Sequence, residues 1–307
     1  MKVLSLFDGI SCGRAALERA GISVEQYTAY EIDKYAVQIS SKNYPDIDHC
    51  GNVFDGDYTQ YRGYDLLLGG SPCTYWSIAK KGRETTPDGE GGRLFMQYVR
   101  ALKESNCKYF LYENNYSIHQ NIKDFISENL GVQPIMINSA LVSAQQRKRC
   151  YWTNIPNVSQ PADKGIMLAD IIDNAVAWTG KSYCLTANYA GATLRNTLER
   201  HQRTMVAQPV RIGDIGSRSQ GQRVYSVCGK SVTLSAAGGG QGGGTGLYKI
   251  DLPDGNYIIR KLSPIECERL QTLPDNYTEG VSNAQRYKQL GNGWTVDVIA
   301  HILGFIK

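Results

Sequence analysis

Short apolar runs that stop at glycine or acidic residues recur through the first part of the chain. They cover residues 2–7, 26–30, 64–68 and 109–112. Runs of this length, bounded by turn-forming residues, predict buried strands. The first run is followed by a turn of small residues, 8–13, and then by an apolar pattern typical of a helix over 15–20. A strand, a glycine turn and a helix form the opening unit of a Rossmann-like α/β fold.

One of these runs ends in a cysteine. Leu66-Leu67-Leu68 stops at Gly69-Gly70, and Ser71-Pro72-Cys73 follows. The turn is expected to place Cys73 at the carboxyl edge of a sheet, where open α/β sheets bind their ligands. A free cysteine is more often a small buried hydrophobe. The position of Cys73 favours a chemical role instead.

Charged residues follow other predicted strands. Glu31 comes after the second strand, where a carboxylate is the usual partner of ribose hydroxyls. Glu113 comes after the strand over 109–112 and suits an acid or a hydrogen-bond partner for a base. Alternation along a further strand over 145–152 predicts that Gln145, Arg147 and Arg149 share one face. A solvated basic patch is the alternative for these arginines.

Composition narrows the class of protein. No apolar run approaches the roughly 20 residues of a membrane span, and no signal-peptide pattern begins the chain. The eight cysteines are scattered without a Cys-x-x-Cys pair and are accompanied by four histidines. This spacing predicts neither a metal site nor a disulfide framework, and it indicates a reducing cytoplasm.

The positive charge is concentrated in one segment. The net charge is +4, whereas residues 181–250 contain nine Lys or Arg and two acidic residues, a local charge of +7. Such a segment indicates a nucleic-acid surface, with an ordinary solvated face as the alternative. Residues 156–257 are rich in Gly, Ser, Thr, Asn and Gln, which predicts a small, loop-rich domain. The glycine-rich residues 74–92 predict a lid next to Cys73.

The last part of the chain returns to regular patterns. Ser263 and Pro264 predict the cap and the first position of a helix that continues to about residue 271. An apolar helix follows residues 289–296 and runs to the end of the chain. Neither Gly-Lys-Ser tripeptide, at 180–182 or 229–231, is a phosphate-binding P-loop, because Ala175 and Val224 stand where the earlier glycine is needed.

Gly70-Ser71-Pro72-Cys73 resembles the Pro-Cys nucleophile motif of the DNA (cytosine-5) methyltransferases, of prokaryotic or phage type. Further motifs that resemble this family occur in order from residue 4 to residue 303, and the first and last are similar to those of the animal de novo enzymes. The resemblance implies a Rossmann-like methyltransferase domain over residues 1–155 and 258–307. It also implies a smaller target-recognition domain inserted over residues 156–257.

The resemblance also implies residue roles. The expected catalytic residues are Cys73, Glu113, Arg147 and Arg149, with Glu113 at N3 of the base and Arg149 on its carbonyl oxygen. The residues expected to bind S-adenosylmethionine, and its product S-adenosylhomocysteine, are Phe7, Asp8, Gly9, Gly13, Glu31, Ile32, Asn52, Val53, Pro72, Leu94, Asn292 and Trp294. The expected DNA contacts are Lys80, Lys81, Arg83, Arg203, Arg211, Arg218 and Arg223.

The function predicted on this basis is DNA (cytosine-5) methylation. A cytosine is flipped from duplex DNA, the Cys73 thiolate attacks carbon 6, and carbon 5 receives the methyl group. A tRNA (cytosine-5) methyltransferase is the second hypothesis, and a catalytically silent DNA- or partner-binding module is the third. We expect a monomer on double-stranded DNA in the cytoplasm of a bacterial or phage-infected cell. The sequence leaves open whether a cognate restriction endonuclease accompanies it.

Overall fold

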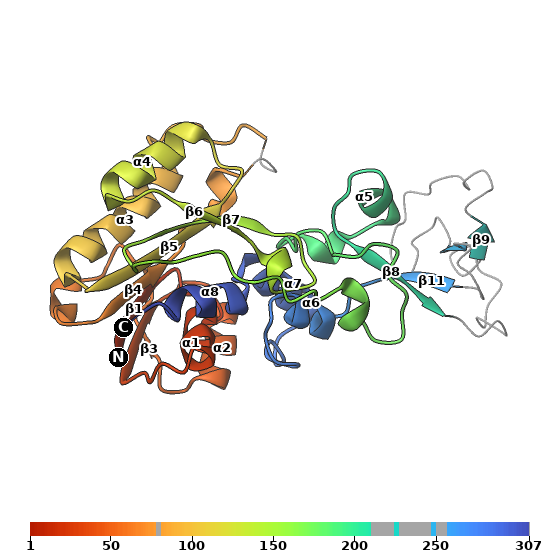
Figure 1. The fold of residues 1–307 in the computed structure, drawn as a ribbon, viewed down its shortest axis with the longest axis horizontal. Helices are drawn as coiled ribbons and strands as arrows, with labels where there is room; N and C mark the ends of the chain where they lie inside the picture. Colours follow the sequence, from red (N-terminus) through yellow and green to blue (C-terminus); the bar gives the residue numbers. More distant parts are fainter. Residues whose placement is uncertain (78–80, 210–223, 227–246, 250–256, 307) are drawn as a thin grey trace.

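The main body of the molecule is built on a seven-stranded sheet. The computed structural model describes residues 1–77, 81–209, 224–226, 247–249 and 257–306. The sheet has the strand order β3-β2-β1-β4-β5-β7-β6 (Figure 1). Its strands are β1 (Lys2–Leu6), β2 (Gln26–Tyr30), β3 (Asp48–His49), β4 (Leu66–Gly69), β5 (Tyr109–Asn115), β6 (Ile135–Asn138) and β7 (Lys148–Thr153).

Helices cover both faces of this sheet. They are α1 (Cys12–Arg19), α2 (Lys34–Asn43), α3 (Glu90–Ser105), α4 (Gln120–Leu130) and α8 (Val296–Leu303). Helices α1, α2 and α8 lie on one face, and α3 and α4 lie on the other (Figure 1). Because side chains alternate along a strand, Leu66 and Leu68 join the first core and Leu67 joins the second. All three leucines are completely buried.

The central strands bring their carboxyl ends to a single edge. Strands β2, β1, β4 and β5 are parallel neighbours, the usual arrangement of buried apolar strands that alternate with helices. Cys73 follows β4 in a single 3-10 turn (Cys73–Tyr75), and Glu113 lies near the end of the adjacent β5. The predicted position of Cys73 at this edge is therefore confirmed.

The prediction of one strand over 145–152 is wrong in its first half. Strand β7 begins at Lys148 and runs antiparallel to both β5 and β6. Gln145 instead forms an isolated bridge with Ser182, and the Gln146 N–H donates to the Ser182 carbonyl at 2.8 Å. The chain here satisfies its backbone groups with the 182–185 segment, so Gln145 does not belong to the sheet.

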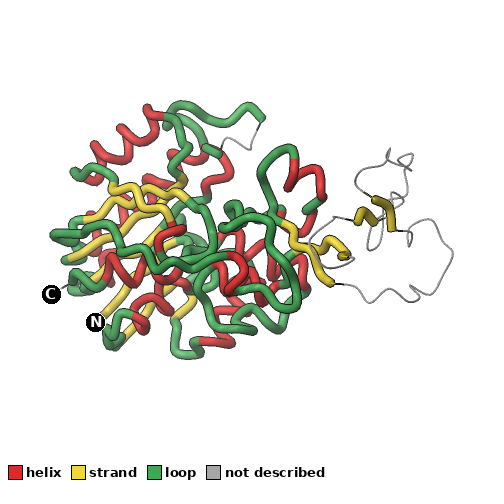
Figure 2. The backbone as a smooth tube through the Cα atoms, turned by 45° about the vertical axis from the view of Figure 1, so that its right-hand side comes forward, coloured by secondary structure: helices red, strands yellow, loops and turns green. Residues whose placement is uncertain are grey.

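A smaller part of the chain lies beside the main body. It contains α5 (Leu194–Leu198), β8 (Met205–Pro209), β9 (Val224–Ser226), β10 (Leu247–Lys249) and β11 (Tyr257–Lys261). Strands β8 and β11 form an antiparallel pair that is separate from the seven-stranded sheet (Figure 2). The predicted domain boundary at residues 257 and 258 falls within β11.

The chain returns to the main body through α6 (Pro264–Leu270) and α7 (Asn283–Asn292). The Ser263 side chain accepts a hydrogen bond from the Glu266 N–H, and the Glu266 carboxylate accepts one from the Ser263 N–H. This reciprocal cap confirms the predicted start of the helix. Helix α8 then packs against α1, which places residues 291–295 beside the first glycine turn.

Candidate active site

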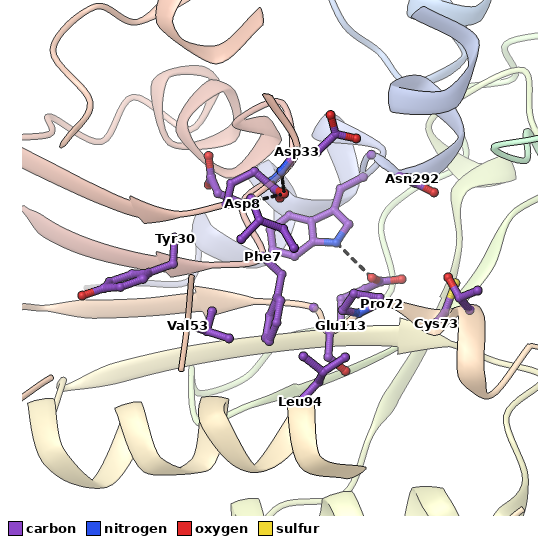
Figure 3. Close-up of a pocket in the computed structure, with 18 of the residues that line it drawn as sticks. Phe7, Asp8, Tyr30, Asp33, Val53, Pro72, Cys73, Leu94, Glu113 and Asn292 are labelled. Atoms are coloured by element: carbon purple, nitrogen blue, oxygen red, sulfur yellow. Dashed lines mark hydrogen bonds between the residues drawn. The ribbon is translucent and has the colours of Figure 1, made fainter. Parts of the chain in front are cut away.

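A cavity of about 470 Å³ opens at the carboxyl edge of the sheet. The segments after β1, β2, β3 and β4 line it, together with Glu113 near the end of β5, the start of β7, Leu94 of α3 and the turn between α7 and α8 (Figure 3). Of the predicted site residues, all four catalytic candidates and eleven of the twelve cofactor candidates line this cavity. Tertiary structure therefore gathers residues that are spread over almost the whole chain.

The first wall of the cavity is the tight turn after β1. Phe7 and Gly9 both have left-handed backbone conformations, with φ of 58° and 60°. Such a conformation is uncommon for a residue with a side chain, and such residues concentrate at ligand sites. The Asp8 carboxylate accepts hydrogen bonds from the hydroxyls of Ser5 and Tyr27 at 2.6 and 2.7 Å. Burial raises the pKa of Asp8, and this effect exceeds the opposite effect of the hydrogen bonds, which lower the pKa.

Glu31 closes this turn from the second strand. Its Oε2 accepts from the Gly9 N–H and its Oε1 accepts from the N–H groups of Ile32 and Asp33, each at 2.8 Å. Burial raises the pKa of Glu31, while these backbone donors lower it. Since a carboxylate oxygen has two lone pairs, Oε2 retains one for a ligand hydroxyl.

Apolar and amide groups complete this end of the cavity. Ile32 is 76% exposed, and with Phe7 and Val53 it presents apolar surface to the cavity. The Asn52 Oδ1 accepts a hydrogen bond from the Phe54 N–H at 3.1 Å, so the side chain is held by its own turn. The described structure thus combines apolar surface with a few fixed polar atoms, which is typical of a small-molecule site.

Gly13 is the cofactor candidate that the structure does not place in the cavity. It lies within α1, and an added Cβ would stand 2.7 Å from Leu68 Cδ1 and 3.0 Å from the Tyr27 hydroxyl oxygen. The glycine is needed because α1 packs too closely on the sheet for any side chain. Its predicted contact with a ligand is therefore replaced by a packing role.

Cys73 is half-buried in the cavity wall. Burial raises the pKa of its thiol, the positive charge of Arg149 lowers it, and the negative charge of Glu113 raises it. A thiolate is the reactive form of cysteine, so the charge on the neighbouring side chains controls the reactivity of Cys73.

Both oxygens of the Glu113 carboxylate are held. The Arg149 Nε lies 2.9 Å from Oε1, and the Trp294 indole N–H donates to Oε2 at 2.9 Å. Figure 3 shows the second of these bonds as a dashed line. Glu113 and Arg149 are both largely buried, with 12% and 11% of their side chains exposed. Separating such a pair would leave an uncompensated buried charge, so each of the two side chains holds the other in place.

Arg147 and Arg149 differ in their partners, although both line the cavity. Arg147 donates to the carbonyls of Leu185, Gly291 and Gly293 at 2.8, 3.1 and 2.9 Å. It therefore ties the start of β7 to the turn before α8. The guanidinium of Arg149 contacts the Glu113 carboxylate instead.

Cys184 was not among the predicted site residues. Its sulfur lies 3.5 Å from Arg147 Nη1 and 3.8 Å from Arg149 Nη2. Burial raises the pKa of this thiol, but the charges of Arg147 and Arg149 outweigh burial and the pKa lies below its usual range. No local pattern around Cys184 indicates this position, since both arginines are more than 30 residues away in the sequence.

Asp33 and Gln289 line the cavity, and sequence reasoning did not predict either of them as a site residue. Asp33 Oδ2 accepts from Lys288 Nζ and from Gln289 Nε2, each at 2.8 Å. This contact joins the start of α2 to α7 at the mouth of the cavity. The only local signal was the position of Asp33 two residues after Glu31.

The predicted DNA contacts lie outside the cavity or outside the described residues. Lys80, Arg211, Arg218 and Arg223 belong to the second group. Lys81 is exposed. The Arg83 Nη1 donates to the Ser117 carbonyl at 2.8 Å, and the Arg203 Nη1 donates to the Gly191 carbonyl at 3.1 Å. Both arginines are thus engaged in contacts within the protein.

Two features are absent from the described part of the chain, a cluster of metal-ligating side chains and a membrane-crossing helix. It contains no group of three or more His, Cys, Asp or Glu side chains arranged to hold a metal ion. It also contains no helix that is long and apolar enough to cross a membrane.

Comparison with known proteins identifies relatives along the whole chain. The C-5 cytosine-specific DNA methylase family model matches residues 1–307. Type II methyltransferase M.HhaI of Haemophilus parahaemolyticus is 29% identical over 323 residues, which cover 98% of this chain and 93% of that protein. Orphan methyltransferase M.SPRI of Bacillus phage SPR is 25% identical, and the match covers 98% of this chain and 96% of that protein.

Solved structures show a similar fold. A mutant of Spodoptera frugiperda DNMT2 superposes with a TM-score of 0.65 and 16% identity, covering 99% of this chain and 98% of that chain. A putative DNA modification methyltransferase encoded within an E. coli prophage gives a TM-score of 0.56 with 18% identity, covering 99% and 98%. With the family model matching from the first residue to the last, the chain belongs to the C-5 cytosine-specific DNA methylase family.

Proposed function

We propose that the cavity is the place where this DNA (cytosine-5)-methyltransferase binds S-adenosylmethionine and its target base side by side. The observation that carries the proposal is the position of Cys73, Glu113 and Arg149 in one cavity with the turn after β1 and Glu31. When bound, S-adenosylmethionine supplies an electrophilic methyl group. The remaining chemistry belongs to the side chains described above.

The residues of the cavity suit such a cofactor. Ile32, Phe7 and Val53 offer apolar surface for an adenine ring, and the free lone pair of Glu31 suits a ribose hydroxyl. Asn52 would accept from the adenine amino group through Oδ1, which has one lone pair beyond its bond to Phe54. The remaining cofactor candidates in the cavity are Asp8, Gly9, Pro72, Leu94, Asn292 and Trp294.

Cys73 acts as the nucleophile. Carbon 5 of cytosine is unreactive, and attack of the thiolate on carbon 6 converts the ring into an enamine whose carbon 5 is electron-rich. After carbon 5 has received the methyl group, its proton leaves to a base and the bond between carbon 6 and sulfur breaks. Cys73 is then regenerated, and the aromatic ring is restored.

Glu113 and Arg149 stabilise the charge that develops in the ring. Glu113 faces N3 of the base and Arg149 holds the carbonyl oxygen, so their mutual contact keeps both groups in place before the base arrives. Arg147 contributes by fixing the turn that bears Trp294. We assign it a positioning role, in place of the direct catalytic role predicted from sequence.

The target cytosine has to leave the duplex to reach Cys73. Residues 156–257 would read the DNA sequence, and residues 74–92 would close over the flipped base. The basic charge of residues 181–250 supports the first assignment. We further propose that the protein acts as a monomer in the bacterial cytoplasm, in line with its bacterial and phage relatives.

A methyl-transfer assay tests the proposal. The full chain is incubated with tritiated S-adenosylmethionine and either duplex DNA of mixed sequence or transfer RNA. We expect label on carbon 5 of cytosine in DNA, no label with Cys73→Ser, and a covalent adduct with DNA containing 5-fluorocytosine. Label on transfer RNA alone would contradict DNA as the substrate, and turnover by Cys73→Ser would contradict the covalent mechanism.

A further inference from the structure

Two lysines from different elements share one exposed aromatic ring beside the cavity. Tyr116 follows the last residue of β5 and is 42% exposed. Lys123 Nζ, from the first turns of α4, lies 4.5 Å from the centroid of its ring, and Lys148 Nζ, from the start of β7, lies 6.0 Å from it. We call these three residues the Tyr116 surface.

The Tyr116 surface carries uncompensated positive charge. Within the described part of the chain, no carboxylate forms an ion pair with Lys123 or Lys148, although many other surface lysines and arginines have such partners. Two like charges near one ring repel each other, and the ring face compensates only part of this. Anionic groups bound to the two ammonium groups would offset the repulsion.

The Tyr116 surface lies next to residues of the cavity in the sequence. None of its three residues lines the cavity, yet Tyr116 lies three residues after Glu113, and Lys148 immediately precedes Arg149. Because neighbouring residues of a strand point to opposite faces, Arg149 turns toward Glu113 while Lys148 lies on the side of α4. The surface therefore flanks the cavity at the same edge of the sheet.

The segment after Cys73 is attached to the same place. The Arg83 guanidinium donates to the Ser117 carbonyl at 2.8 Å, next to Tyr116 in the sequence. When a base enters the cavity, its nucleotide stays joined to its two neighbours in the DNA strand. The sugar-phosphate backbone of that strand therefore has to run across the carboxyl edge of the sheet. A phosphodiester on one side of the base then comes close to the Tyr116 surface.

We propose that the Tyr116 surface binds backbone phosphates of the DNA strand that carries the target cytosine. This inference rests on the proposed function, because it takes duplex DNA as the substrate. It assigns part of the DNA affinity to the catalytic body, outside the basic segment 181–250. Lys123 and Lys148 each contact a phosphate, and the Tyr116 ring holds the two ammonium groups in position.

The salt dependence of DNA binding tests this proposal. Removing a lysine that binds one phosphate of B-DNA reduces the slope of log affinity against log salt by about 0.9. The double variant Lys123→Ala/Lys148→Ala is titrated with a fluorescein-labelled duplex of mixed sequence over a range of sodium chloride concentrations. We expect its slope to be smaller than that of the wild-type protein by about 1.8. An unchanged slope would overturn the proposal.

Strand β5 supplies a matched control at its other end. Lys108 Nζ lies 4.7 Å from the ring centroid of Tyr109, the same type of pair at the amino edge of the sheet. Lys108→Ala is expected to leave the slope unchanged, and an equal reduction with this variant would overturn the proposal. Thermal unfolding of all variants confirms that they fold.

Failure of this inference differs from failure of the proposed function. Methylation of DNA by the wild-type protein, together with an unchanged slope in the double variant, rejects only the Tyr116 surface. Absence of methylation on DNA rejects the proposed function. A slope change seen with transfer RNA and not with DNA would reject the Tyr116 surface as a site for DNA phosphates, whereas the proposed function is still decided by methylation of DNA.

Discussion

The indole N–H of Trp294 donates to Glu113 Oε2 at 2.9 Å, across 181 residues of sequence. Trp294 reaches this carboxylate from the turn before α8, while Arg149 binds the other oxygen from β7. The same indole lies beside the start of α1, since an added Cβ on Gly13 would stand 3.6 Å from its ring. Trp294 thus connects the proposed cofactor end of the cavity with the proposed base end.

Trp294→Phe is therefore expected to slow methyl transfer. The substitution keeps most of the ring but removes the N–H donor, and a hydrogen bond to a charged group contributes about 1.5–3 kcal/mol. Loss of about 1.4 kcal/mol from transition-state stabilisation corresponds to a tenfold lower rate. We expect kcat to fall about tenfold or more, with little change in KM for S-adenosylmethionine, as measured by single-turnover and steady-state kinetics.

Trp152→Phe is the control for this experiment. Trp152 Nε1 also donates over 2.9 Å, to Ser127 Oγ in the second core, away from the cavity. Its replacement should lower the free energy of unfolding and leave kcat of the folded enzyme unchanged. Equal kinetic effects of the two variants would contradict a positioning role for the Trp294 N–H.

The pH dependence of Cys73 alkylation should respond to its two charged neighbours in opposite directions. Glu113→Gln removes a negative charge that raises the pKa of Cys73, so its alkylation profile should move to lower pH. Arg149→Gln removes a positive charge that lowers this pKa, so the profile should move to higher pH. Iodoacetamide labelling of the Cys73 peptide, followed by mass spectrometry, measures both shifts.

Arg149→Lys provides the comparison, because it keeps the charge and loses the planar guanidinium. It should shift the alkylation profile less than Arg149→Gln does while still lowering the methylation rate. Shifts of the same sign for Glu113→Gln and Arg149→Gln would show that these charges do not control the thiol.

Gly13→Ala is expected to destabilise the protein. The added methyl group would overlap Leu68 and the Tyr27 hydroxyl, and overpacking of a core costs about 1–3 kcal/mol. Urea unfolding measures the effect. Gly304→Ala is the control, because its Cβ would meet helix carbonyls at 3.4 Å, an ordinary contact. Equal stability of Gly13→Ala and the wild-type protein would mean that α1 can move away from the sheet without penalty.

Asn52→Asp is expected to tighten S-adenosylmethionine binding. Either side chain accepts the Phe54 N–H, so the turn is kept, but only the carboxylate offers a charged acceptor to the adenine amino group. The gain should be about 0.5–1.5 kcal/mol, the contribution of one hydrogen bond. Calorimetric titration of the two proteins measures it, and equal affinities would show that residue 52 does not contact adenine.

Local elements and the position of Cys73 could be predicted from the amino-acid sequence alone. An apolar run such as Leu66-Leu67-Leu68 has to be buried, and the glycines and proline that follow it end the strand. The strand and the position of its carboxyl end can therefore be predicted without knowledge of the tertiary structure. The start of α6 could also be predicted from local sequence. Ser263 and Glu266 accept hydrogen bonds from backbone N–H groups of the first turn, and Pro264 suits the first position of the helix.

The pairing of the charged groups, in contrast, depends on the folded arrangement of the chain. Arg147 and Arg149 are two residues apart and look alike in sequence, yet one binds backbone carbonyls and the other binds Glu113. The close packing of Gly13 against the sheet and the contact of Cys184 with both arginines could not be predicted from the sequence either. The physical reason is that each of these contacts depends on how distant segments pack together. That packing is set by the summed burial of the whole core and not by any local pattern.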